Sequence, residues 1–132
     1  MGGLVTSGYL VPISTSSIDL PINLPVNERS LDSEIIRLSK QYAVNEKTVR
    51  KIIQCESRMY PKAVNENKDK NGITWSKDWG PMQINDYYHN TEMSKLNLDI
   101  HDEYDSLEYG IKLLATQGTK PWTASEKCWS KI

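Results

Sequence analysis

Glu56 is the residue of this sequence whose surroundings most clearly predict acid–base chemistry. At about 100° per residue, Glu56 falls on the same helical face as the apolar residues Val49, Ile52 and Ile53. Burial among apolar side chains disfavours the charged carboxylate and raises its pKa, as a general acid requires near neutral pH. The same pattern also fits a helix end at which Glu56 turns into solvent, so the periodicity alone leaves both interpretations open.

Asp78 is a second candidate carboxylate, and a turn signal precedes it. Asn71-Gly72 lies in a polar stretch and is typical of a type I′ turn, whose two central residues both need positive φ. We therefore expect a small β-hairpin within residues 65–78, with Asp78 at the end of its second arm. Gly80-Pro81 then breaks the hairpin.

Helical periodicity predicts the elements that must position these carboxylates. Residues 32–42 form one helix, with Asp32 or Ser33 as its cap, and Asn45 caps the helix that ends near Glu56. Asn90 or Thr91 caps a short helix that runs to residue 96.

The C-terminal third predicts two further helices. Apolar spacing over residues 104–114 indicates a long helix that Gly118 ends. Gly110 inside it costs about 1 kcal/mol relative to alanine, which suggests close backbone packing at that point. Thr123-Ala-Ser-Glu126 has the pattern of a capping box and opens a short last helix.

The composition limits the class of protein. The 132 residues are 38% hydrophobic and 25% charged, which fits one globular domain, and the net charge of −1 gives no basic field for nucleic acid. No window approaches the roughly 18 apolar residues of a membrane span. His89 and His101 have no cysteine or carboxylate at ligand spacing, so we expect no metal site.

The first 29 residues have a composition of their own. Gly, Ser, Thr and Pro dominate, and no Lys or Arg precedes Arg29, so this is no ordinary signal peptide. Residues 1–6 formally match a myristoylation pattern, although the match is short and a cloning scar or a truncated linker explains it better. We expect residues 1–29 to form an extended or disordered tail and residues 30–132 to form the folded domain.

Four short segments, in this order, resemble motifs of the lysozyme superfamily, most closely its Slt-type lytic transglycosylase branch. They are a helix ending in Glu-Ser (residues 40–57), residues 61–64, the Gly-Pro-Met-Gln-Ile segment (residues 80–84), and Tyr-Gly with Leu-Leu in residues 109–114. The resemblance covers residues 30–132. It implies an α+β fold, mostly α, that is lysozyme-like with a small β-hairpin.

Residues 65–85 also resemble the segment in which c-type lysozymes hold their second carboxylate, and Asp78 occupies that position. The chain departs from the transglycosylase pattern at two places. Pro81 replaces an aliphatic residue, and residues 121–129 stand where many transglycosylases have Ala-Tyr-Asn. The second departure leaves open which residues form the wall of the substrate cleft.

The resemblance implies that the protein cleaves the β-1,4 bond between N-acetylmuramic acid and N-acetylglucosamine in peptidoglycan, without a cofactor. Glu56 is the expected general acid and base, and the muramic acid's own C6 hydroxyl is the expected nucleophile. Asp78 either stabilises positive charge at the anomeric carbon or is a solvated hairpin residue. Lysozyme-type hydrolysis with Glu56 and Asp78 is one alternative, and a non-catalytic cell-wall glycan-binding module is another.

Substrate contacts are expected from a set of polar and aromatic residues, namely Ser57, Gln83, Asn85, Tyr109 and Trp122. Each also has a structural interpretation. A glutamine can form hydrogen bonds that keep neighbouring groups in place, and a small domain fills its core with Tyr and Trp. Trp75 and Trp79 are further candidates for stacking on sugar rings.

The two cysteines indicate in which cellular compartment the protein acts. An even cysteine count and a substrate outside the cytoplasm predict a disulfide between Cys55 and Cys128, with two buried free thiols as the alternative. We expect an extracytoplasmic monomer with peptidoglycan glycan strands as its partner, no nucleic acid and no transmembrane segment.

Overall fold

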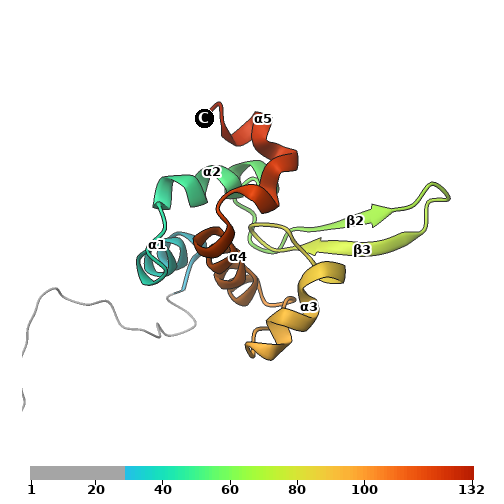
Figure 1. Ribbon diagram of the computed structural model, residues 1–132, viewed down its shortest axis with the longest axis horizontal. Helices are drawn as coiled ribbons and strands as arrows, with labels where there is room; N and C mark the ends of the chain where they lie inside the picture. The colour runs from blue at the N-terminus through green and yellow to red at the C-terminus, as the bar shows by residue number, and fades with distance from the viewer. Residues whose placement is uncertain (1–28) are drawn as a thin grey trace, which may run out of the picture.

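The computed structural model describes residues 29–132, which form five α-helices, a 3₁₀-helix and a three-stranded sheet (Figure 1). In chain order the elements are α1 (Leu31–Gln41), α2 (Glu46–Ser57), β2 (Val64–Lys68), β3 (Thr74–Trp79), β4 (Ile84–Asn85), α3 (Asp86–Lys95), α4 (Glu103–Gln117), η3 (Lys120–Ser125) and α5 (Glu126–Trp129). The predicted mostly helical α+β class is confirmed. The predicted tail and the myristoylation pattern lie, except for Arg29, outside the described residues.

Side-chain caps fix the starts of the first two helices. Asn45 accepts the N–H of Thr48 and caps α2, as predicted. The prediction of Asp32 or Ser33 as the cap of α1 was wrong, because Ser30 occupies that position. Ser30 and Ser33 accept each other's backbone N–H at 3.0 Å, which satisfies two donors of the first turn reciprocally.

The three strands form an antiparallel sheet in the order β2-β3-β4, and the hairpin of β2 and β3 projects from the helical part (Figure 1). The expected hairpin is present, but its type I′ turn is not. Gly72 has φ +80°, whereas Asn71 does not have positive φ. The Asp69 carboxylate accepts the N–H groups of Asn71 and Ile73, and this favours the longer connection of residues 69–73 over a two-residue turn.

Helix α3 begins earlier than the sequence suggests. Asn85 caps it and accepts the N–H of Tyr88, so the predicted caps Asn90 and Thr91 were wrong. The error has a physical cause. The first turn of α3 has no apolar stripe to reveal it, since Tyr87 and Tyr88 are both exposed.

The C-terminal helices are those expected, although one of them starts differently. Helix α4 ends at Gln117, and Gly118 follows with φ +68°. The capping box predicted at Thr123 does not form, because that hydroxyl donates to the carbonyl of Lys120 and α5 has no side-chain cap. A disulfide joins Cys55 of α2 to Cys128 of α5, with 6.0 Å between their Cα atoms, as predicted.

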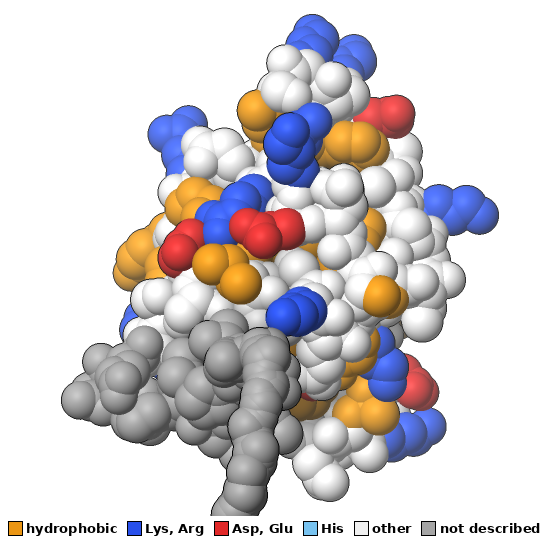
Figure 2. Space-filling view, turned by 90° about the vertical axis from the view of Figure 1, so that its left-hand side faces the viewer, with side chains coloured by type: hydrophobic (Ala, Val, Ile, Leu, Met, Phe, Trp, Pro, Cys, Tyr) orange, Lys and Arg blue, Asp and Glu red, His pale blue; other side chains and the backbone are white. Residues whose placement is uncertain are grey.

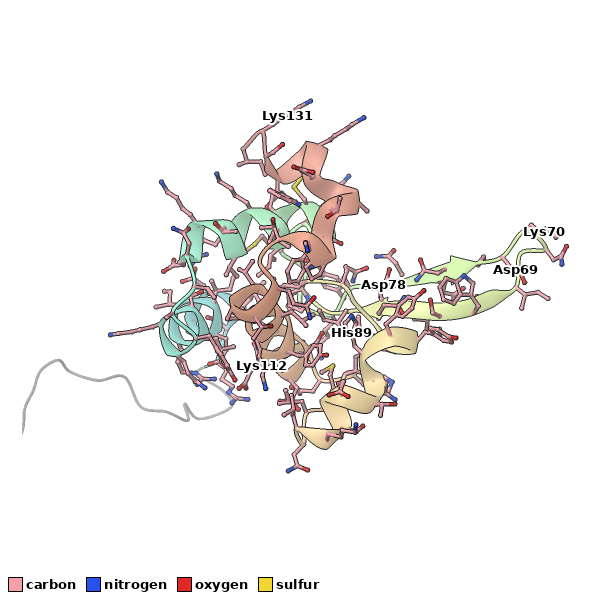
Figure 3. All side chains as sticks on the ribbon, in the orientation of Figure 1. Asp69, Lys70, Asp78, His89, Lys112 and Lys131 are labelled. Atoms are coloured by element: carbon pink, nitrogen blue, oxygen red, sulfur yellow. A yellow bond between two sulfur atoms is a disulfide. The ribbon has the colours of Figure 1, made fainter. Side chains whose placement is uncertain are left out.

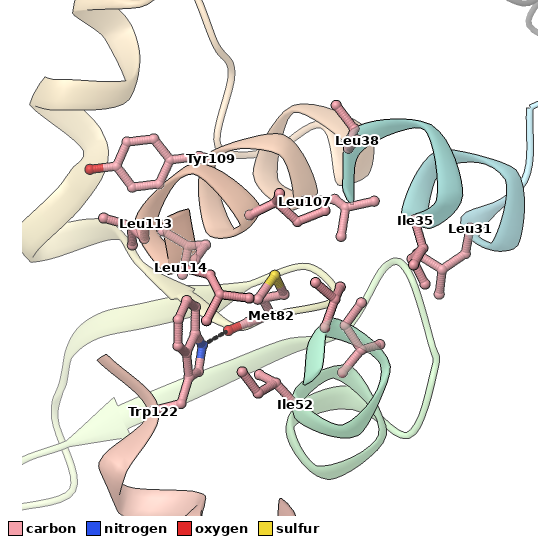
Figure 4. Close-up of a cluster of buried hydrophobic side chains, with 14 of the residues drawn as sticks. Leu31, Ile35, Leu38, Ile52, Met82, Leu107, Tyr109, Leu113, Leu114 and Trp122 are labelled. Carbon is pink, nitrogen blue, oxygen red and sulfur yellow. Dashed lines mark hydrogen bonds between the residues drawn. The ribbon is translucent and has the colours of Figure 1, made fainter. Parts of the chain in front are cut away.

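Met82 lies at the centre of the hydrophobic core, among side chains from α1, α2, α4 and η3 (Figure 4). A Cβ on Gly110 would lie only 2.6 Å from Sδ of Met82, so the predicted close packing at this glycine is confirmed. The indole N–H of Trp122 donates to the carbonyl of Met82 at 2.9 Å (Figure 4). The core therefore fixes η3 against the segment between β3 and β4.

Candidate active site

Glu56 lies in the last turn of α2 and is half-buried. Burial raises the pKa of its carboxyl group, a hydrogen bond from Ser125 lowers it in part, and the negative charge of Asp78 raises it further. The net direction is upward, which favours a protonated carboxyl group at higher pH than an ordinary glutamate allows. The side chain thus has the protonation behaviour of a general acid.

Ser125 contacts this carboxyl group from the other end of the chain. Its hydroxyl donates to Oε2 of Glu56 at 2.5 Å and also lies 3.2 Å from the carbonyl oxygen of Trp122. The disulfide between Cys55 and Cys128 joins α2 to α5 close in sequence to both residues of this contact. Sequence reasoning missed Ser125. The signal that could have found it is the cysteine pair, since Cys55 precedes Glu56 and Cys128 lies about one helical turn after Ser125.

Asp78 lies at the base of the hairpin, close to the helical part of the molecule (Figure 3). Its Oδ1 accepts two amide N–H groups, from Asn85 at 2.8 Å and from Asn67 at 3.1 Å. Both amides also lie 3.0 Å from the hydroxyl of Ser76. Hydrogen bonds therefore hold the Asp78 carboxylate in place, and it is not a freely solvated hairpin residue. Its negative charge raises the pKa of Glu56. Sequence reasoning also missed Asn67, because no local pattern relates it to Asp78.

A hollow of about 270 Å³ lies between α3, α4 and η3, and it brings together three of the predicted contact residues: Gln83, Asn85 and Trp122. Tyr88 and His89 of α3 also line it. A larger hollow of about 580 Å³ lies beside α2, but its lining includes neither Glu56 nor Asp78. Neither carboxylate lines the smaller hollow, but two of its lining residues connect it to both: Asn85 donates to Asp78, and the carbonyl of Trp122 accepts from Ser125, whose hydroxyl also contacts Glu56. These connections, and not size, make the smaller hollow the candidate substrate site.

The structure gives polar partners within the protein to these contact residues. The amide of Gln83 donates to the carbonyl groups of Ala63 and Gly80, and its oxygen accepts from Asn65 at 2.7 Å. Asn85 both caps α3 and holds Asp78. Their roles toward a substrate remain predictions.

Ser57 and Tyr109 lie deeper than a substrate contact usually does. The Ser57 side chain is buried, and its hydroxyl donates to the carbonyl of Ile53 at 3.1 Å. Tyr109 is buried as well, and its hydroxyl lies 3.1 Å from Nδ1 of His89. Burial also lowers the pKa of His89. Neither residue lines the hollow, so both positions favour their structural interpretation.

Charges on the face that carries α1 and α2 are of mixed sign (Figure 2). Arg50 of α2 pairs with Asp32 of α1 at 2.7 Å and with Glu46 of α2 at 2.9 Å. Between residues 29 and 132 no three metal-binding side chains cluster. In that same range no helix has the length and apolar character needed to cross a membrane.

Comparison with known proteins identifies a family for this chain. A family model described as "Transglycosylase SLT domain" matches residues 33–126, more than half of the chain. The matched range includes Glu56, Asp78 and Ser125. No curated protein matches the chain.

Proposed function

Because this chain belongs to the transglycosylase SLT domain family, we propose that it cleaves the glycan strands of bacterial peptidoglycan. The bond is the β-1,4 linkage between N-acetylmuramic acid and N-acetylglucosamine. The observation that supports this proposal best is Glu56, a half-buried carboxyl group with a raised pKa that Ser125 connects to Trp122, a residue lining the hollow.

Glu56 acts first as an acid and then as a base. Its proton goes to the glycosidic oxygen as the bond from the anomeric carbon to that oxygen breaks. The resulting carboxylate takes a proton from the C6 hydroxyl of the same muramic acid, whose oxygen bonds to the anomeric carbon. Because the nucleophile is part of the substrate, its effective concentration is high and no second catalytic group is needed to bind it. The product has a 1,6-anhydro end.

Hydrolysis is a second candidate, and Asp78 favours it. A carboxylate held by two amide donors keeps its position while positive charge develops at the anomeric carbon. Water then takes the place of the C6 hydroxyl, as in retaining glycosidases that use a pair of carboxyl groups. The two candidates share Glu56 and differ in their products.

The disulfide supports a location outside the cytoplasm. Disulfides persist in oxidising compartments, and peptidoglycan lies in such a compartment. We therefore propose an extracytoplasmic protein that acts in the cell envelope, is secreted or is delivered by a phage.

Digestion of purified peptidoglycan tests the proposal. The wild-type protein is expected to release fragments that are lighter by one water than their hydrolysed counterparts, as determined by mass spectrometry. Glu56→Gln keeps the shape of the side chain but has no transferable proton, so the rate is expected to fall at least about 10²–10⁴-fold. Near wild-type cleavage by this variant would reject Glu56 as the acid.

The same assay tests the non-catalytic alternative. A glycan-binding module would sediment with peptidoglycan but release no fragments, and Glu56→Gln would leave that binding unchanged.

A further inference from the structure

Three exposed aromatic side chains form a cluster where the hairpin meets α3. Trp75 of β3 is 49% exposed, and Tyr87 and Tyr88 of α3 are 69% and 66% exposed. Their rings pack edge to face, with centroids 5.6 Å apart for Trp75 and Tyr87, 6.4 Å for Trp75 and Tyr88, and 5.1 Å for Tyr87 and Tyr88. We call these three residues the aromatic platform.

The aromatic platform contributes little to the hydrophobic core. Within the described part of the chain, none of its members belongs to the core cluster or is among the partly buried side chains packed against it. Large exposed apolar groups in contact with one another are unusual unless they mark a binding surface. The packing of the rings fixes their orientation, so little side-chain entropy remains to be lost on binding.

Tyr88 connects the platform to the candidate substrate site. It lines the same hollow as Gln83, Asn85 and Trp122. Its backbone N–H donates to Asn85, which in turn holds Asp78. Trp75 lies where the register between β2 and β3 shifts, and its ring packs against both tyrosines. The platform therefore begins at Tyr88 and extends outward along the start of α3.

The chemistry of the platform fits the sugar rings of a glycan strand. Aromatic rings offer flat apolar faces for the C–H faces of pyranose rings, and phenol and indole groups offer hydrogen bonds to hydroxyl groups at the ring edges. A surface for anionic lipid needs clustered cations around its aromatic residues. Here the charges nearby have both signs, since Lys77 lies two residues from Trp75 and Asp86 precedes Tyr87.

We propose that Trp75, Tyr87 and Tyr88 form an outer binding platform that holds the glycan strand beyond the bond to be cleaved. This inference rests on the proposed function. It implies that the enzyme binds long strands more tightly than short fragments, because only a long strand extends from the hollow past Tyr88 to Trp75 and Tyr87.

Binding of an inactive protein to glycan strands tests the platform. The parent is Glu56→Gln, and the ligand is peptidoglycan glycan freed of its peptides, with affinity measured by sedimentation. Adding Trp75→Ala and Tyr87→Ala is expected to weaken binding roughly tenfold, as for the removal of aromatic anchors from other interfaces. Ile36→Ala removes an exposed apolar side chain on α1 and serves as the matched control, with no change expected.

Kinetics separate the platform from the catalytic step. In the otherwise wild-type protein, the Trp75→Ala/Tyr87→Ala variant is expected to raise KM for long strands roughly tenfold while kcat and the cleavage of tetrasaccharides stay unchanged. Unchanged affinity for long strands, or an equal loss on tetrasaccharides, would overturn the inference. So would a loss of binding to phosphatidylglycerol vesicles without a loss of binding to glycan.

The proposed function fails in a different way. If the Glu56→Gln parent binds strands through the platform but the wild-type protein releases no fragments, the platform stands and the cleavage proposal falls.

Discussion

The hydroxyl of Ser125 lies 2.5 Å from Oε2 of Glu56, although 69 positions separate the two residues in the chain. The bond stabilises the charged carboxylate and so opposes the larger effect of burial on the pKa of Glu56. Burial thus raises the pKa of Glu56, and one hydroxyl group from the C-terminal segment lowers it in part.

Ser125→Ala should shift the pH dependence of cleavage. Without the donor the pKa of Glu56 rises further, so the protonated acid persists to higher pH and the alkaline limb of kcat/KM moves upward. Ser125→Thr keeps the hydroxyl and should keep the wild-type profile. A lower melting temperature with an unmoved alkaline limb would show that Ser125 serves only the packing of η3.

Asp78→Asn should shift the same limb in the opposite direction. The charge of Asp78 raises the pKa of Glu56, and its removal lets that pKa fall, so activity is lost at lower pH than in the wild type. Glu66→Gln on β2 is the matched control, because it removes a charge from the same hairpin without touching Asp78.

The products of Asp78→Asn separate the two reactions. If the C6 hydroxyl attacks, the variant keeps substantial activity and its products remain lighter by one water. An inactive Asp78→Asn protein, together with wild-type products that all have reducing ends, would show that the enzyme hydrolyses its substrate.

Glu56→Gln should stabilise the fold at neutral pH. The folded state raises the pKa of Glu56, so ionisation favours the unfolded chain, and stability falls as the pH rises from the ordinary glutamate pKa through the raised one. Glutamine does not ionise and avoids this loss. Urea midpoints should therefore be higher for the variant at pH 7, and the difference should vanish at acid pH, where Glu56 is protonated in both states.

Removing the disulfide should cost stability on the order of 4 kcal/mol, from the chain-entropy model for a loop that closes across this sequence separation of 73 residues. Urea titration of the Cys55→Ser/Cys128→Ser variant measures the loss, and wild-type protein with reductant provides the comparison. Thiol titration of the denatured, unreduced wild type should find no free thiol. Two reactive thiols would contradict the bridge.

Local patterns in the sequence predicted those features that depend on near neighbours. Asn45 caps α2 and Gly118 ends α4 because a cap or a positive φ needs only the adjacent turn. The hairpin was foreseen for the same reason. The details of its loop were not, because the side chain of Asp69 competes with the turn that Asn71-Gly72 prefers.

The candidate site was predictable only in part. Apolar periodicity and family motifs point to Glu56 and Asp78. The partners that set their behaviour come from elsewhere, since Ser125 arrives with the last helices and Asn67 reaches Asp78 across the hairpin. No local spacing rule relates either pair, and only the cysteine pair of α2 and α5 carries a sequence signal for the contact of Ser125 with Glu56.

Because Met82 packs against Gly110, the residue at one of these positions limits which residues are tolerated at the other. The backbone at Met82 is held by the indole N–H of Trp122, so the chain cannot move aside to admit a larger residue at position 110. A side chain gained at position 110 is therefore tolerated only when position 82 becomes smaller, and the two substitutions are strongly non-additive. In a library of variants, permitted residues at these two positions should therefore occur as matched pairs.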